Sequence, residues 1–182
     1  MAVLLFPDNT VLINFALINR MDLLSRLANG NGRWCATVEQ ECLQSAAYEG
    51  LVALGDAADI FGDPLFPETR FEHLNVRTFR DELAEPNDPP HKHLGEAETL
   101  AIMSSRNIHG FFVTDDGGAR RLAARHGIQV VDTWKLMHIA IKKGFVDAAT
   151  VWGYVQTLRA SKRPVPSNLR SRQSVDLWAA GG

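Results

Sequence analysis

Six carboxylates stand where this sequence changes from one kind of secondary structure to another. Asp115 and Asp116 come just after Thr114, which follows residues 111–113, an apolar run fit for a buried strand. Asp8 follows the apolar run of residues 3–6 in a similar way. The remaining acids lie in the early turns of expected helices: Glu41, Glu96 and Glu98. Because open α/β sheets bind ligands at the carboxyl ends of their strands, these side chains can share one cleft.

Carboxylates that are forced together repel one another and raise each other's pKa, so such a cluster requires a neutralising cation. Oxygen-only ligand sets suit Mg²⁺ or Mn²⁺ and do not suit zinc. One or two such ions can activate water and stabilise the leaving oxygen of a phosphodiester. Taken singly, each acid has a structural explanation: Asp8 would cap a helix, and Glu41 would complement a helix dipole. Their coincidence favours a metal site, and we expect Asp8, Glu98 and Asp116 to converge closely enough to share one cation.

The hydrophobic spacing defines the elements that would position these acids. The expected strands are residues 3–6, 33–36, 73–76, 111–113 and 128–131. The expected helices include residues 51–61, 117–126, 133–143 and 147–158, together with one that begins near Gly95. Strands that alternate with helices in this way predict a parallel sheet covered on both faces.

Two shorter segments carry local signals. Residues 37–40 have the Thr-x-x-Gln spacing of a capping box at the start of the helix that contains Glu41. Residues 85–93 contain three prolines, which forbid regular structure and predict a loop. His91 and His93 lie in this loop, and without a third ligand nearby we interpret them as surface histidines.

The bulk composition bounds the class of protein. A chain of 182 residues with 46% hydrophobic and 22% charged residues is typical of one soluble globular domain. It has no apolar run of about 20 residues and no signal peptide at its start, so we expect a cytoplasmic protein that makes no membrane contact. The two cysteines, Cys35 and Cys42, lack a second pair for zinc and are expected to be reduced and buried.

Several motifs then match a known family in order and spacing. They are the segment around Asp8 and Asn9, the helix with Glu41, LGEAETLAI at residues 94–102, and VTDDGGARRLAARHGIQVVDTWKLM at residues 113–137. With these motifs the sequence resembles the PIN-domain family, the nuclease fold of VapC-type toxins and related ribonucleases. The resemblance implies an α/β, three-layer fold with a central, mostly parallel sheet flanked by helices. It places a nuclease domain at residues 1–158 and leaves residues 159–182 as a basic, flexible tail.

The resemblance also implies roles for individual residues and for partners. The catalytic acids would be Asp8, Glu41, Glu98 and Asp116, and the ligands of Mg²⁺ or Mn²⁺ would be Asp8, Glu96, Glu98, Asp115 and Asp116. Whether Glu39 replaces Glu41, or Glu96 replaces Glu98, stays open. Thr114 and Asn9 would support the site, and RNA would contact Arg120, Arg121 and Arg125. The implied protein is a ribonuclease, the toxin of a toxin–antitoxin pair, with an antitoxin protein as partner and a homodimer as assembly.

Three other classes of protein also use acidic sites of this kind. A haloacid-dehalogenase-like phosphatase needs a second aspartate two residues after the first, where this chain has Thr10. A response-regulator receiver needs a lysine past a later strand, and residues 131–133 contain none. The remaining alternative is a PIN-like fold without nuclease activity that binds RNA or docks a protein.

The segment after Ser161 shows no helical or strand period, so we expect an unstructured tail attached at most by Trp178. Five basic residues and no acid occur between positions 159 and 172: Arg159, Lys162, Arg163, Arg170 and Arg172. The tail is either a solvated chain end or a source of phosphate contacts that an acidic cleft cannot make.

Overall fold

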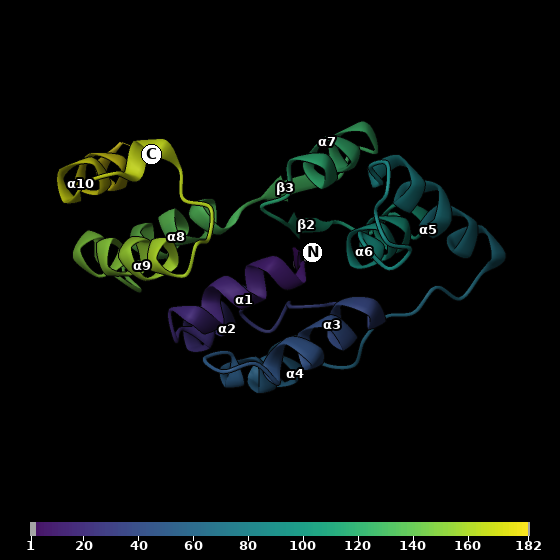
Figure 1. The fold of residues 1–182 in the computed structure, drawn as a ribbon, viewed down its shortest axis with the longest axis horizontal. Helices are drawn as coiled ribbons and strands as arrows, with labels where there is room; N and C mark the ends of the chain where they lie inside the picture. The colour runs from purple at the N-terminus through teal and green to yellow at the C-terminus, as the bar shows by residue number, and fades with distance from the viewer. Residues whose placement is uncertain (1–2, 182) are drawn as a thin grey trace.

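A three-stranded parallel sheet lies at the centre of the computed structural model, which describes residues 3–181 (Figure 1). Its strands are β1 (Leu4–Pro7), β2 (Gly110–Val113) and β3 (Gln129–Val131), in that spatial order. Pro7 of β1 pairs with Val113 of β2, which pairs with Val131 of β3. The three parallel strands therefore end together, and the loops that follow them emerge at one edge of the sheet.

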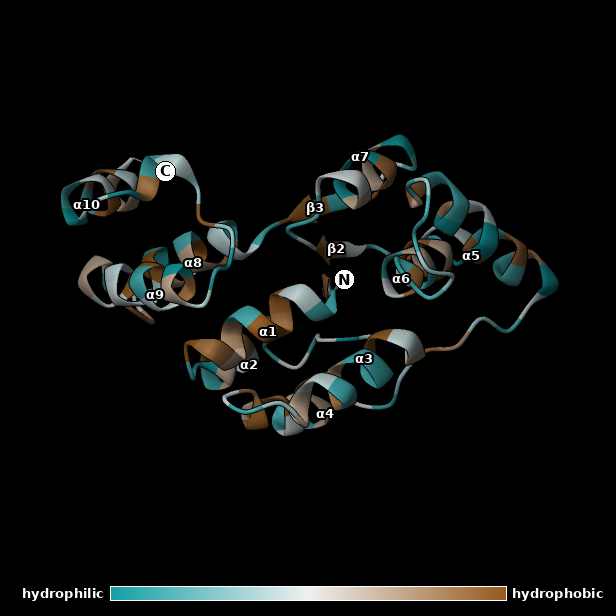
Figure 2. Ribbon diagram, viewed as in Figure 1, coloured by the Kyte–Doolittle hydropathy of each residue, from teal (hydrophilic) through white to brown (hydrophobic). Residues whose placement is uncertain are grey.

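Helices form the remaining layers and fill the connections between the strands (Figure 1). Their bounds are α1 (Asn9–Leu17), α2 (Met21–Ala28), α3 (Ala36–Ala46), α4 (Ala57–Phe61), α5 (Arg70–Leu83), α6 (Leu94–Ser105), α7 (Gly117–Arg125), α8 (Thr133–Lys142), α9 (Ala148–Ala160) and α10 (Arg172–Ala180), with short 3₁₀ helices η1 (Val52–Asp56) and η2 (Ser167–Leu169). In Figure 2, outer helices such as α5 and α7 alternate hydrophilic and hydrophobic residues, as expected where one side faces the core. Across residues 3–181, no helix combines the length and apolar character that crossing a bilayer requires.

The pleat of the sheet sends side chains into two separate cores. Phe6 and Phe112 pack in a cluster with residues of α5, α6 and α7. Leu5 and Val113 belong to a larger cluster with residues of α1 to α4 and α8 to α10. Because successive residues of a strand point to opposite faces, two short strands supply both cores. The result is the expected three-layer α/β fold.

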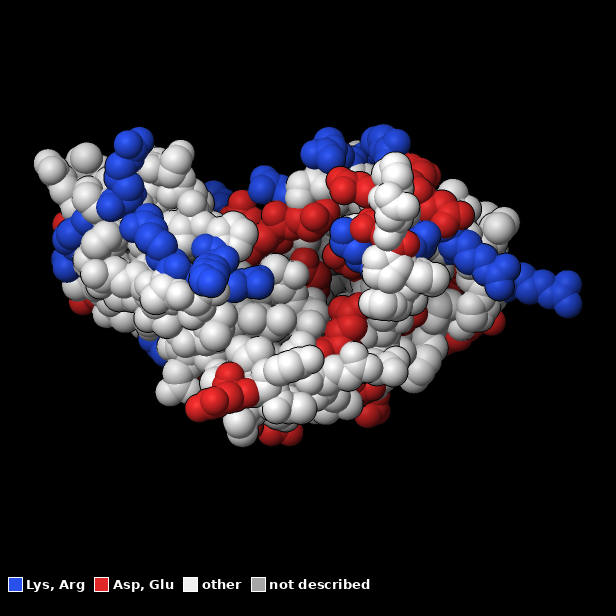
Figure 3. Space-filling model, viewed as in Figure 1, with Lys and Arg blue, Asp and Glu red and all other residues white. Residues whose placement is uncertain are grey.

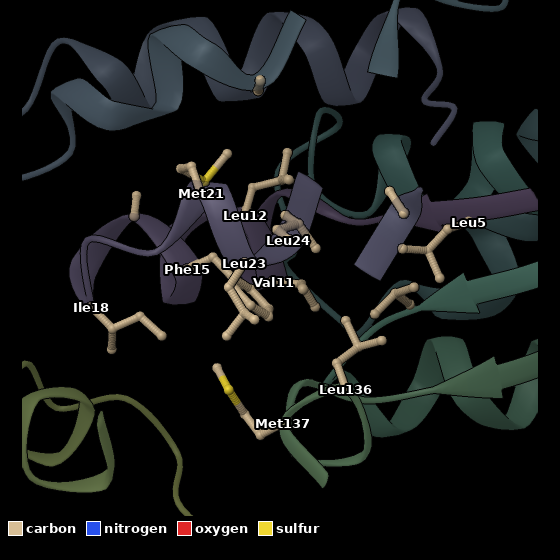
Figure 4. Close-up of a cluster of buried hydrophobic side chains, with 14 of the residues drawn as sticks. Leu5, Val11, Leu12, Phe15, Ile18, Met21, Leu23, Leu24, Leu136 and Met137 are labelled. Carbon is tan, nitrogen blue, oxygen red and sulfur yellow. The ribbon is translucent and has the colours of Figure 1, made fainter. Parts of the chain in front are cut away.

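Helix α1 is the centre of the larger core (Figure 4). Val11, Leu12 and Phe15 on this helix are fully buried. Burying one such side chain stabilises a fold by roughly 1.5–3 kcal/mol. This burial holds the start of α1, and Asp8 in front of it, in a fixed position at the end of β1.

Two expected strands are wrong. Residues 33–36 form no strand. Within the segment only Cys35 makes an isolated bridge, with Leu65, and α3 already begins at Ala36; the other bridge, of Leu5 with Gly32, lies just before the segment. Residues 73–76 belong to helix α5, which begins with a capping box between Thr69 and Glu72. This Thr-x-x-Glu signal was present in the sequence and outweighs the β propensity of the short run that follows it.

The expected capping box at residues 37–40 is also wrong. Helix α3 begins one residue before Thr37, and its N-cap, Cys35, provides no side-chain hydrogen bond. The Thr37 hydroxyl donates instead to the carboxylate of Glu98 on α6. The contact with Glu98 therefore uses the Thr37 hydroxyl, which the local sequence pattern had assigned to a helix cap.

The last segment is structured, contrary to the sequence-based expectation. Helix α10 begins at a Ser171–Ser174 capping box, and Leu169 and Val175 are fully buried in the larger core. Trp178 packs against the same core. Two or three well-spaced apolar residues anchor this polar segment, and their spacing is too sparse to give a periodic signal.

Candidate active site

The ends of β1 and β2 are joined through the side chain of Thr114. Its hydroxyl donates to Oδ2 of Asp8 at 2.5 Å and accepts a hydrogen bond from the Asp116 backbone at 3.1 Å. Asp8 is the N-cap of α1, and its Oδ1 accepts from the Val11 N–H at 2.8 Å. Asp8 is 3% exposed and Thr114 is fully buried. The structure therefore holds both acidic loops through one buried hydroxyl.

Asp115 is held by three hydrogen bonds from two buried residues, Asn14 and Thr133. The Thr133 backbone N–H and hydroxyl donate to Asp115 at 2.9 and 2.7 Å. The Asn14 amide donates to Asp115 Oδ2 at 2.8 Å and to the Thr133 hydroxyl oxygen at 3.1 Å. These bonds connect the loop after β2 with α1 and with the start of α8.

Asp116 caps the next helix. Its Oδ1 accepts from the Ala119 N–H of α7 at 2.6 Å, while the carboxylate also lines a pocket at the sheet edge. An aspartate in this position satisfies an exposed N–H and complements the helix dipole. The same side chain is thus held by local structure and turned towards the cleft.

The glutamates of α3 and α6 divide into two groups. Glu98 is 9% exposed, and its carboxylate accepts from the Thr37 hydroxyl at 2.6 Å and from the Thr37 N–H at 3.2 Å. Glu41 and Glu96 line the pocket. Glu41 approaches α6 closely because residue 95 is glycine, where an added Cβ would lie 3.0 Å from Glu41 Oε2.

The pocket itself has a volume of about 650 Å³. Glu41, Glu96, Asp115 and Asp116 line it together with cationic side chains from two other segments, Lys92 and Arg163. Figure 3 shows acidic side chains gathered along the hollow near the middle of the drawn face, with basic side chains at its borders. The site is an acidic cleft with positive charge on its rim.

Burial and mutual repulsion raise the pKa of two of these acids. Burial, assisted by the nearby Glu96 and Asp115 carboxylates, raises the pKa of Asp8 to about 8, although the hydrogen bonds from Thr114 and Val11 act in the opposite direction. Burial, together with repulsion from Glu96 and Glu98, raises the pKa of Glu41 to about 7. The acids therefore act on one another as a cluster, as neighbouring carboxylates do.

A comparison with protein families identifies the fold. A family model described as a PIN domain matches residues 5–173. The chain belongs to the PIN-domain family. Comparison with curated proteins and with solved structures finds no match. Proteins of this family are generally nucleases that use divalent metals, so the acidic cleft has a family context as well as a chemical one.

The cleft of this PIN domain suits a hard divalent cation. Its acids offer carboxylate oxygens, which Mg²⁺ and Mn²⁺ prefer. Burial and neighbouring carboxylates raise the pKa of Asp8 and Glu41, and a bound cation would favour their ionised forms. The expectation that Asp8, Glu98 and Asp116 already share one site is not met. Within residues 3–181, no three His, Cys, Asp or Glu side chains are arranged to close on one ion. The Asp8 carboxylate is bonded to the Thr114 hydroxyl, and the Glu98 carboxylate is bonded to the Thr37 hydroxyl.

The other predicted residues lie as follows. Asn9 donates to the hydroxyl of Ser45 on helix α3 at 3.0 Å. Arg120 pairs with Asp132 at 3.4 Å and Arg125 with Glu82 at 2.6 Å. Arg121 and Arg125 line a second pocket of about 800 Å³ that also contains Asp116. The basic face of α7 therefore continues from the acidic cleft.

Sequence analysis missed several residues of the site. The interpretation of His93 as a surface histidine is wrong, because its side chain is 12% exposed and lies between Asp88 and Glu96. In the sequence, Asn14 and Thr133 are polar residues in expected helices without any sign of a role in the site, yet both form hydrogen bonds with Asp115. No local signal in the sequence distinguishes them. Arg163 was grouped with the tail, and its place at the cleft depends on the packing of α9.

Proposed function

We propose that this PIN domain is a metal-dependent ribonuclease that hydrolyses phosphodiester bonds. The observation that carries the proposal is the gathering of Asp8, Glu41, Glu96, Asp115 and Asp116 at one edge of the sheet, around a pocket with a cationic rim. An all-carboxylate cluster binds cations, and its rim of positive charge suits a phosphate-bearing substrate. The two features together match nucleic acid hydrolysis better than any reaction of a neutral substrate.

Each group in the site has a distinct role in the proposal. Asp8, Glu96, Asp115 and Asp116 would hold Mg²⁺ or Mn²⁺, with Glu41 as a further acid. A divalent ion in such a site supplies activation of water and stabilisation of negative charge on the phosphate. Thr114 fixes the relative position of the two acidic loops, and Glu98 fixes α3 against α6 through Thr37.

The identity of the substrate and of the partners also belongs to the proposal. RNA is favoured because the LGEAE and TDD motifs resemble those of VapC-type toxins, and this role places the activity in the cytoplasm. We propose an antitoxin protein and a second copy of the chain as partners. Exposed apolar side chains in the segment after α3 support such contacts, since Tyr48 is 69% exposed and Val52 is 75% exposed.

The test combines binding and cleavage. Mg²⁺ or Mn²⁺ should raise the melting temperature of the purified protein, and the same ions should support cleavage of a labelled single-stranded RNA. EDTA should abolish both effects. A protein that cleaves RNA equally well after EDTA treatment contradicts the metal requirement, and one that binds metal but leaves RNA intact contradicts the nuclease.

A second candidate function is an RNA-binding or protein-docking module without catalysis. It is favoured by the finding that, in the part of the chain described, no three acids are arranged to close on an ion. This alternative predicts RNA binding that does not change between EDTA and Mg²⁺. It also predicts no cleavage with either Mg²⁺ or Mn²⁺.

A further inference from the structure

Arg163 follows the C-terminal end of α9 and lines the acidic cleft. Lys162 adopts a left-handed conformation with φ of 56°, and the Arg163 N–H donates to the Leu158 carbonyl at 2.8 Å. This is the hydrogen bond of a Schellman motif, which ends a helix and reverses the direction of the chain. Pro164 follows and prevents the helix from continuing. The local turn therefore fixes where Arg163 leaves the helix.

Arg163 is anchored by neutral acceptors. Its Nε donates to Asn14 Oδ1 at 2.7 Å, and its Nη2 donates to the Thr10 carbonyl oxygen at 3.3 Å. Over residues 3–181 it forms no ion pair, and its Nη1 makes no hydrogen bond. Lys92, the other cation on the pocket wall, is paired with Asp88 at 2.7 Å. Within the described residues, Arg163 thus brings to the cleft a positive charge that is not held in an ion pair.

Asn14 connects this arginine to the acids. Its carbonyl oxygen accepts from Arg163, and its amide nitrogen donates to Asp115 at 2.8 Å. Asn14 is 1% exposed, so it is held in one position by the surrounding core. The guanidinium is therefore positioned relative to the acidic cluster before any ligand arrives, and binding would cost little side-chain ordering.

We propose that Arg163 binds a phosphate group of the nucleic acid substrate at the wall of the acidic cleft. This inference rests on the proposed nuclease function. It assigns Arg163 as the positive group that holds the substrate phosphate in that function. Carboxylates repel a phosphodiester, so a fixed positive group must offset that repulsion on the substrate side of the cleft. A guanidinium presents planar, paired donors that match phosphate oxygens, and the donors on Nη1 remain for this contact.

The experiment measures RNA binding without chemistry. Wild type, Arg163→Gln, Arg163→Lys and the control Arg77→Gln bind a fluorescent single-stranded RNA in EDTA at several salt concentrations. Arg77 is exposed on α5 and does not line the pocket, so its variant removes the same charge elsewhere. Arg163→Gln should bind on the order of ten-fold more weakly. Its slope of log affinity against log salt should be smaller by about 0.7, the value of one contact on a single strand.

Two further measurements separate this contact from a structural role. Arg163→Lys should keep the salt slope and recover part of the affinity, and Mg²⁺ should still raise the melting temperature of Arg163→Gln. If Arg163→Gln does not fold, Arg163→Lys is compared with Arg77→Lys, and equal RNA affinity of these two proteins overturns the proposal. Unchanged affinity and slope in folded Arg163→Gln also overturn it.

The outcome for Arg163 is distinguishable from that of the nuclease proposal. If wild type cleaves RNA and Arg163→Gln has the same binding and salt slope, the nuclease stands and the phosphate contact fails. If no variant cleaves RNA but Arg163→Gln still loses affinity in EDTA, the contact stands and the nuclease fails.

Discussion

The hydroxyl of Thr114 lies 2.5 Å from Oδ2 of Asp8 and links the ends of two neighbouring strands. Both residues are buried, and Thr114 also accepts the backbone N–H of Asp116. One side chain therefore couples the acid after β1 to the acids after β2. Any change that removes this hydroxyl should alter both loops at once.

Thr114→Val tests this coupling. Valine keeps the shape of threonine but leaves Oδ2 of Asp8 and the N–H of Asp116 without the hydroxyl that they bond. We expect a loss of about 1–3 kcal/mol in the free energy of unfolding, the usual cost of an unpaired buried polar group. Denaturant unfolding measures it. Thr114→Ser keeps the hydroxyl and serves as the control, and equal stability of the two variants would contradict the coupling.

Stability without metal should depend on pH. The pKa of Asp8 is raised from 3.8 to about 8, and that of Glu41 from 4.5 to about 7. A carboxyl whose pKa is raised in the folded state stabilises the fold when the pH is below its ordinary pKa. This contribution disappears as the pH rises through the folded-state pKa. The melting temperature in EDTA should therefore fall between about pH 4 and pH 8.

The matched measurement for this pH effect uses Asp8→Asn. Asparagine caps helices as well as aspartate does but carries no charge, so the variant should show a flatter pH profile in EDTA. Saturating Mg²⁺ should flatten the profile of the wild type, because the ion favours the ionised carboxylates. A wild-type melting temperature that rises from pH 5 to pH 8 in EDTA would contradict this prediction.

Asp116→Asn should leave the fold intact and remove most cleavage activity. Mutation of residues that only support metal ligands typically lowers metal affinity or activity by about 10–100-fold. Loss of a ligand charge should therefore lower the cleavage rate by at least about 100-fold. Asp132→Asn is the control, because Asp132 caps α8 in the same way but does not line the acidic cleft. Cleavage rates of the two variants in Mg²⁺ are compared, and a similar loss in both would contradict the assignment of Asp116.

The glycine of the LGEAE motif should resist substitution. In Gly95→Ala the new Cβ would lie 3.0 Å from Glu41 Oε2 and 3.1 Å from Val38 Cγ2, so these two side chains of α3 must shift to make room. We expect a loss of about 1–3 kcal/mol in the free energy of unfolding and weaker Mg²⁺ binding. Gly153→Ala on α9 is the control, since its Cβ meets no atom within 4 Å. The control variant should gain about 0.5–1 kcal/mol in the free energy of unfolding. Equal effects at both sites would show that the contact between α3 and α6 is not the cause.

The C-terminal segment should contribute to stability as well as to binding. Leu169 is fully buried in the larger core, so Leu169→Ala should cost about 2–5 kcal/mol. Leu177→Ala on α10, which is 67% exposed, should change stability by less than about 0.5 kcal/mol. Thermal unfolding compares the two. A flexible tail would give no difference between them, and the structure predicts a large one.

The sequence by itself determined the elements whose signals are local. The apolar runs that became β1, β2 and β3 are bounded by Pro7, Thr114 and Asp132. The sequence also placed Asp8, Asp115 and Asp116 just past the ends of β1 and β2, where the structure has them. Strand pairing in parallel order follows from the alternation of strands and helices. These features depend on residues a few positions apart, so the pattern of one segment is sufficient to predict them.

Only the tertiary structure decided which acid of each pair faces the cleft. Glu96 lines the pocket while Glu98 bonds Thr37, and Glu41 lines it while Glu39 does not. The rotation of a helix about its axis depends on the atoms it packs against, here the close approach of α3 and α6 at Gly95. Arg163 and Asn14 are separated by 149 positions and meet only because α9 packs beside α1. Contacts of this kind depend on close packing across the whole core, which no local pattern of residues encodes.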